Sequence, residues 1–217
     1  MKRTAFAIAF CLFTLTALAQ TSAQNDAFSI EPVSNTVFKR MQGKSYKADC
    51  TIPLTDLRYL RVLHYTAEGT VKQGEIVCHR DIAPDLIDIF RKLFDAHYPI
   101  EHIQLIDNFN ADDEQSMLHN NTSCFNFRHI AGSQKLSYHS QGKAIDLNPL
   151  YNPCVKRKKD GTTSVSPKAG RPYANRSKTF KYKIDRNDLA YKLFIEHGFT
   201  WGGAWKSLKD YQHFEKQ

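Results

Sequence analysis

The sequence lacks several features that would define a class of protein at once. No internal repeat is visible, and none of the five cysteines lies in a Cys-x-x-Cys pair, which argues against a zinc site built from cysteines. Only one long apolar run is present, at residues 5–19, and it is shorter than the roughly 20 residues needed to span a bilayer. No motif that reads a nucleic-acid groove is found.

The N-terminus has the pattern of a secretory signal peptide. Lys2 and Arg3 precede the apolar run, and small residues at Ala17 and Ala19, or at Thr21 and Ala23, offer cleavage sites. A membrane anchor is the alternative, but the run is too short for it. We therefore predict that residues 1–23 are a cleaved signal peptide. The protein would be exported to the periplasm or the extracellular space, with no transmembrane segment after cleavage.

Basic charge is concentrated in one part of the mature chain. Cleavage after Ala23 leaves 194 residues, enough for one domain with a substantial core. Between Lys156 and Lys183 there are ten basic residues and a single acid, Asp160. Such a segment is typical of a protein that binds nucleic acid, of one that binds an anionic surface, or of a solvated loop. Export argues against nucleic acid as the partner. Two interpretations remain: the segment binds an anionic envelope polymer, or it is a solvated loop.

Four cysteines remain after cleavage, namely Cys50, Cys78, Cys124 and Cys154. An even number in an exported chain favours two disulfides, which can pair in three ways. We expect Cys124 to pair with Cys154 and Cys50 with Cys78, because each pair joins segments that we expect to be neighbours in the sheet.

Apolar spacing and turn residues divide the rest of the chain into short elements. Residues 24–55 are expected to form an N-terminal arm. The expected strands are 57–65 and 70–79, which form a hairpin, followed by 101–107, 123–128, 144–148 and 211–215. Strands and helices do not alternate regularly. This pattern predicts a single α+β domain at residues 56–217, with a small antiparallel sheet and helices packed on it.

Two helices are expected within this domain. The first begins at Asp81, a capping acid, with Pro84 in its first turn. The second is capped by Asp185 and ends at Gly198. Residues 151–183, before the second helix, show no clear pattern. We expect an irregular segment there that is functional or mobile.

Two short motifs carry metal-binding residue types. Residues 137–146 read Ser-Tyr-His-Ser-Gln-Gly-Lys-Ala-Ile-Asp, so that Gly142 permits a tight turn between His139 and Asp146. Near the C-terminus, Asp-Tyr-Gln-His offers a third ligand at His213. A catalytic zinc site needs three protein ligands and one open position. Each motif alone is weak, because single histidines are usually surface or core residues, but together they predict a zinc site.

The complete pattern resembles a known family. Ser-x-His-x-x-Gly-x-Ala-Ile-Asp, followed by Trp-Gly-Gly-x-Trp and Asp-x-x-His-Phe-Glu, is similar to the VanY-like zinc peptidases. These are D-alanyl-D-alanine carboxypeptidases and dipeptidases, together with phage L-alanyl-D-glutamate endopeptidases. The resemblance covers residues 121–215. It implies that His139, Asp146 and His213 bind Zn²⁺ in a metallopeptidase domain acting on peptidoglycan peptides.

The resemblance also implies roles for three other residues. Asp210, three positions before His213, matches the catalytic base, for which many members have glutamate. Arg128 lies where the family has an arginine that would stabilise the developing oxyanion or the substrate carboxylate, although a surface salt bridge is the alternative. Ser137 matches a serine that contacts the substrate backbone. If Asp210 is not the base, Glu215 is the nearest other acid.

These residues leave two functions open. The first is hydrolysis of peptidoglycan stem peptides, either by removal of a terminal D-Ala or by cleavage between L-Ala and D-Glu. The second is a catalytically inactive, zinc-bearing protein that binds the cell wall. The presence of Asp210 with all three ligands favours hydrolysis. We expect the protein to act as a monomer.

Overall fold

The computed structural model describes residues 27–130 and 132–217. The predicted signal peptide at 1–23 lies outside these residues. Among the described helices, none has the length and apolar character required to cross a membrane.

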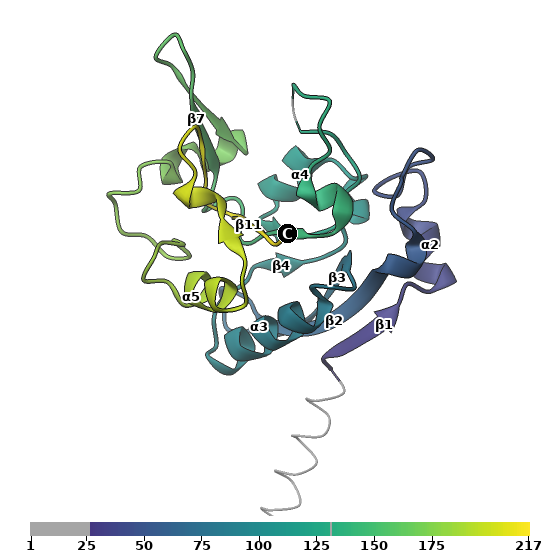
Figure 1. Ribbon diagram of the computed structural model, residues 1–217. Helices are drawn as coiled ribbons and strands as arrows, with labels where there is room; N and C mark the ends of the chain where they lie inside the picture. Colours follow the sequence, from purple (N-terminus) through teal and green to yellow (C-terminus); the bar gives the residue numbers. More distant parts are fainter. Residues whose placement is uncertain (1–26, 131) are drawn as a thin grey trace, which may run out of the picture.

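The N-terminal half is built on an antiparallel sheet of three strands. In the order β1-β2-β3, these are Ser29–Pro32, Leu57–Tyr65 and Val71–His79. Strands β2 and β3 form the hairpin that the sequence predicts. Leu60, Val62 and Ile76 belong to the main core together with the apolar side of helix α3 (Ala83–Asp95), which packs on β2 (Figure 1).

The start of α3 differs from the prediction in one respect. Pro84 lies in the first turn as expected, but the residue at the cap is Ile82, which makes no side-chain cap hydrogen bond. Asp81 instead forms ion pairs with His79 and Lys143, at 3.2 and 3.3 Å. Since Lys143 belongs to a distant segment, the sequence near Asp81 could not reveal this competing partner.

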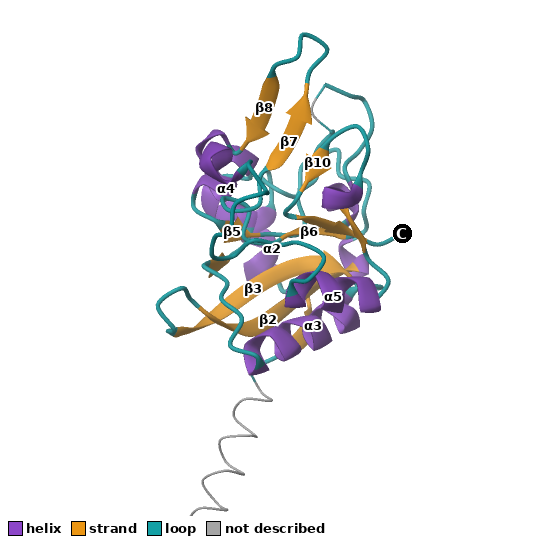
Figure 2. Cartoon of the chain, turned by 90° about the vertical axis from the view of Figure 1, so that its left-hand side faces the viewer, coloured by secondary structure: helices purple, strands orange, loops and turns teal. Residues whose placement is uncertain are grey.

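A second antiparallel sheet holds the C-terminus. Its strands, in the order β6-β11-β9, are Ala144–Asp146, His213–Glu215 and Thr200–Trp201. Helix α5 (Leu189–Glu196) packs beside α3, as Figure 2 shows. Phe194 of α5 stacks on Phe214 of β11 with ring centroids 4.3 Å apart, so the main core continues from the first sheet to the second.

The cap of α5 is Asp188 and not Asp185 as predicted. The Asp188 carboxylate accepts hydrogen bonds from the backbone N–H groups of Ala190 and Tyr191. Asp185 accepts one from Asn187, before the helix begins. The helix ends at Glu196, and the predicted stop, Gly198, follows with a φ of +79°.

The basic segment is more ordered than the sequence predicts. Strands β7 (Cys154–Arg157) and β8 (Thr163–Ser166) form a hairpin, followed by the 3₁₀ helix η4 (Lys168–Tyr173). Strand β10 (Lys209–Asp210) completes this third sheet in the order β10-β7-β8. The prediction of irregular structure was wrong for these strands. In both ribbon views the hairpin projects away from the first sheet (Figures 1 and 2).

Short elements connect the three sheets. Four predicted strands differ: 101–107 contains only β4 (His102–Ile103), 123–128 contains no strand, and 144–148 and 211–215 are shortened to β6 and β11. The remaining elements are α2 (Asn35–Met41), η1 (Leu54–Asp56), η2 (Ile106–Phe109), α4 (Asp113–Leu118), β5 (Asn121–Thr122), η3 (Tyr138–Gln141) and η5 (Gly202–Ala204). Strands β4 and β5 pair in parallel. The predicted α+β domain with antiparallel sheets is nevertheless confirmed.

The expected N-terminal arm supplies β1, which pairs with β2, and α2, whose buried residues Val37 and Met41 belong to a second, smaller core cluster. The boundary between this arm and the peptidase domain, placed between residues 55 and 56, stays a prediction.

All four described cysteines are free, so neither predicted disulfide is formed. Cys50 packs against the smaller core cluster, whereas Cys78 is buried in the main core. Cys124 contacts the carbonyl of Gly142 at 3.5 Å, and Cys154 lies in β7 opposite Asp210. The prediction failed because the partners belong to different packing environments.

Candidate metal centre and active site

A tight turn joins the two residues of the first metal-binding motif. His139 lies in η3, which ends at Gly142 with φ of +66°. A Cβ atom at Gly142 would be 2.7 Å from the backbone nitrogen of His79, so both the backbone angle and the available space require glycine. The chain then enters β6, which ends at Asp146. The turn predicted from the sequence is present.

Strand pairing brings the second motif to the first. Strands β6 and β11 are antiparallel, and His213 lies directly opposite Asp146 in their register. Residues that face each other across two strands have closely spaced Cβ atoms. A ligand 67 positions away in sequence is thereby placed beside Asp146 by backbone hydrogen bonds alone.

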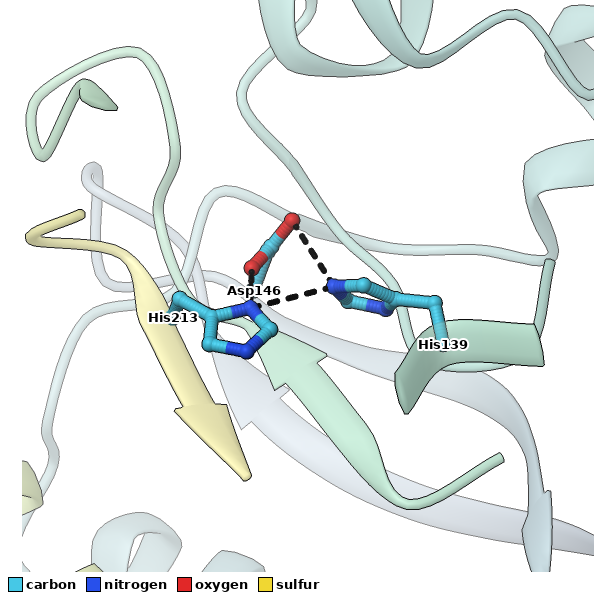
Figure 3. A group of neighbouring side chains, drawn as sticks. All are labelled: His139, Asp146 and His213. Atoms are coloured by element: carbon cyan, nitrogen blue, oxygen red, sulfur yellow. Dashed lines mark hydrogen bonds and ion pairs between the residues drawn. The ribbon is translucent and has the colours of Figure 1, made fainter. Parts of the chain in front are cut away.

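Three donor atoms converge on one point, as Figure 3 shows. His139 Nε2 lies 3.2 Å from His213 Nδ1 and 3.3 Å from Asp146 Oδ2, and His213 Nδ1 lies 3.0 Å from Asp146 Oδ1. Donors bound tetrahedrally at zinc, with bonds of about 2.0 to 2.1 Å, lie about 3.3 Å apart. The three side chains fit one metal ion of this size, and they are also almost completely buried.

Both histidines have a partner on the ring nitrogen that faces away from this point. His139 Nδ1 lies 2.6 Å from the backbone carbonyl oxygen of Cys124. His213 Nε2 lies 3.0 Å from Oε2 of Glu215. Acceptors at these positions hold N–H on the outer nitrogens, so His139 Nε2 and His213 Nδ1 are the nitrogens that would bind a metal.

The electrostatic field of the site favours positive charge. Burial disfavours a charged His213, but hydrogen bonds with Asp146 and Glu215 outweigh burial and raise the pKa of His213 to about 10. Although burial acts in the opposite direction, His139 and His213 hold the pKa of Asp146 below its usual range. A field that stabilises a proton on His213 also stabilises a divalent cation.

Asp210 lies beside the three donors without being one of them. Burial, reinforced by the charge of Asp146, raises the pKa of Asp210 to about 6, while His213 and His139 act in the opposite direction. Its Oδ1 accepts a hydrogen bond of 3.2 Å from Gln212 Nε2. The role of Asp210 as general base stays a prediction.

The structure does not bring Arg128 into this group. Its guanidinium forms an ion pair with Asp113 of α4. Its backbone N–H donates to Ser140 Oγ at 2.8 Å, which ties it to the residue that follows His139. Ser137 is buried, and its hydroxyl accepts a hydrogen bond of 3.3 Å from the His139 N–H at the start of η3. The substrate roles of Arg128 and Ser137 stay predictions.

Three residues of the Trp-Gly-Gly-x-Trp and His-Phe-Glu motifs also shape the site. Gly202 leaves room for Asp210 and His213, because a Cβ atom there would be 2.7 Å from the Asp210 carbonyl oxygen and 3.2 Å from the His213 Cβ. Trp205 packs on the His213 ring with centroids 5.2 Å apart. Glu215 contacts the same ring. The one available signal for Glu215 was its spacing of two from His213, which puts both side chains on one face of a strand.

Comparison with known families agrees with this geometry. A family model described as D-alanyl-D-alanine carboxypeptidase matches residues 131–216, a range that contains the three donors and Asp210. No curated protein and no solved structure matches the chain. The family match supports a peptidase activity on peptidoglycan. Residues 131–216 are therefore similar to the D-alanyl-D-alanine carboxypeptidase family, in agreement with the VanY-like resemblance of the motifs.

Proposed function

We propose that this protein is an exported zinc peptidase that hydrolyses peptidoglycan stem peptides. The observation that carries the proposal is the convergence of His139, Asp146 and His213 beside Asp210, within the segment that matches the family. Two neutral histidines and one carboxylate suit zinc, and they leave a position for water or substrate. Export is proposed from the signal-peptide pattern at residues 1–23.

The chemistry follows from the positions of these side chains. A zinc ion held by the three donors would polarise the scissile carbonyl and lower the pKa of water toward neutrality. Asp210 accepts the proton from the attacking water and delivers it to the leaving amine. Because Asp210 and His213 are three residues apart, the short backbone segment between them fixes the position of the base relative to a metal ligand. This role for Asp210 supports hydrolysis over the binding-only alternative.

Arg128 is the proposed cation for the substrate. A carboxypeptidase has to pair the free carboxylate of its substrate with a positive charge, whereas an endopeptidase does not. The backbone of Arg128 is fixed to Ser140, and Asp113 orients its guanidinium. We also retain Ser137 as a contact for the substrate backbone. An arginine held in this way can form two parallel hydrogen bonds to a carboxylate.

Digestion of purified muropeptides with the zinc-loaded protein tests the proposal. Mass spectrometry of the products would show loss of one D-Ala for a carboxypeptidase, or separation of L-Ala from D-Glu for an endopeptidase. The Asp146→Ala variant, which removes one donor, is the matched control. Unchanged muropeptides with the zinc-loaded wild-type protein would contradict hydrolysis and support the binding-only function.

A further inference from the structure

His213 is held at both ring nitrogens by carboxylates. Its Nδ1 faces Asp146 at 3.0 Å, on the side where the donors converge. Its Nε2 faces Glu215 at 3.0 Å, on the opposite side. Residues two apart in a strand lie on the same face, so β11 itself keeps Glu215 against His213. Both side chains are largely buried, with 7% of His213 and 15% of Glu215 exposed.

We propose that Glu215 is a positioning residue that orients His213 and strengthens its binding of the metal, an inference that rests on the proposed zinc site. An ionised carboxylate can only accept hydrogen bonds. Glu215 therefore holds a proton on Nε2 of His213, so that Nδ1 is the nitrogen that would bind the metal. Its negative charge also makes the ring a better electron donor.

The two histidine ligands differ in their outer partners. His139 is oriented by the backbone carbonyl of Cys124, which no substitution at position 124 removes. His213 is oriented by a side chain, so its outer contact can be deleted by one substitution. Trp205 restricts the His213 ring by packing but offers no acceptor to Nε2. Among the described residues, Glu215 is the hydrogen-bond partner of this nitrogen.

The same geometry argues against Glu215 as the general base. The imidazole ring of His213 lies between the Glu215 carboxylate and the nitrogen that faces Asp146 and His139. A base has to reach the attacking water within hydrogen-bond distance. Glu215 thus acts through His213, and Asp210 remains the acid beside the donors.

The zinc dissociation constants of the Glu215→Ala and Glu215→Gln variants test this role. Affinity would be measured by competition with a chromophoric chelator, so the readout does not depend on peptidase activity. We expect Glu215→Ala to bind zinc about 10- to 100-fold more weakly than the wild type, as is typical when an outer partner is lost. Glu215→Gln keeps an acceptor without the charge, and we expect it to recover part of the loss. Glu196→Ala, at an exposed glutamate of α5, should leave the affinity unchanged.

Thermal unfolding in excess chelator separates positioning from simple stabilisation of the fold. A lower unfolding temperature with wild-type zinc affinity in both variants would overturn the proposal. If Glu215→Ala does not fold, Glu215→Gln decides alone: an intermediate loss of affinity supports the role, and an unchanged affinity overturns it. A wild-type protein that binds no zinc would instead overturn the proposed function, so the two failures are distinguishable.

Discussion

At the scale of single residues, the proposed function assigns metal binding and proton transfer to different side chains. His139, Asp146 and His213 direct their donor atoms at one point, whereas Asp210 lies beside them. Because Asp210 and His213 are only three positions apart, substitutions at the two positions should give different patterns of loss if the assignment is correct.

The Asp210→Asn substitution tests the base. Asparagine keeps the size and most of the hydrogen-bonding capacity of aspartate but does not accept a proton at neutral pH. We expect zinc to remain bound and turnover to fall by about 10² to 10⁴, the range for loss of acid–base catalysis. Steady-state kinetics on muropeptides and metal analysis of the same sample give both quantities. His213→Ala should lose metal and activity together, and wild-type turnover in Asp210→Asn would require another base.

A second residue links pH to stability. Burial raises the pKa of Asp188, the cap of α5, to about 6. The folded state then holds the Asp188 proton more tightly than the unfolded state does. The stabilisation of the folded state by this proton is complete below about pH 4 and is lost as the pH rises through 6. Asp188→Asn still caps the helix but does not titrate.

We therefore expect the variant to show a smaller decrease in unfolding free energy between pH 4 and pH 7 than the wild type. Chemical denaturation at both pH values measures this difference. Identical pH dependence in the two proteins would show that Asp188 does not titrate in this range.

At the scale of elements, the turn between β9 and β10 packs against the segment that carries Asp210 and His213. Gly202 packs against the Asp210 backbone at a distance that excludes a Cβ atom. Gly202→Ala should therefore displace Asp210 or His213. A displacement of about 1 Å can cost a factor of about 10² in rate, so we expect turnover to fall at least tenfold.

The kinetic constants of Gly202→Ala would be compared with those of Ala204→Ser, an exposed position in the same turn. We expect wild-type turnover for Ala204→Ser. Wild-type turnover in Gly202→Ala as well would contradict the close packing of the turn on Asp210.

The basic hairpin is the second element with a testable role. Lys156, Arg157, Lys158 and Lys159 are exposed at its outer end. If they attract an anionic envelope polymer, replacing all four with glutamine should raise the apparent KM on whole sacculi several-fold and leave small soluble peptides unaffected. The difference should fade at high salt, because exposed charges are screened.

A control with the same charge change replaces exposed lysines elsewhere, at Lys39, Lys47, Lys72 and Lys192. This control should leave the KM on sacculi close to that of the wild type. Equal effects of the hairpin variant on sacculi and on soluble peptides would favour the solvated-loop interpretation.

At the scale of the whole molecule, local patterns were predictable and long-range contacts were not. The β2–β3 hairpin and the Gly142 turn follow from alternation and from the need for a positive φ. The meeting of His213 with Asp146 was anticipated through the family motifs. The cap at Asp188, the cysteine environments and the contact of Glu215 with His213 depend on register and packing, which nearby sequence does not specify.

The β7–β8 hairpin was likewise not predictable from the local sequence. Its strands are rich in charged and small polar residues, and Val165 is its one fully buried hydrophobic side chain within the described structure. The usual apolar signal for a strand is therefore weak. Strand β7 also pairs with β10, which is distant in sequence, and the local pattern does not indicate this contact.

The central claim is that His139, Asp146 and His213 form one zinc site, and zinc content per chain tests it most directly. We expect the purified mature protein to hold about one zinc ion, and His139→Ala and Asp146→Ala to lose it, since each removes one of three protein ligands. Circular dichroism should show that both variants remain folded. Full zinc content in both folded variants, or none in the wild-type protein after loading with zinc, would contradict the account.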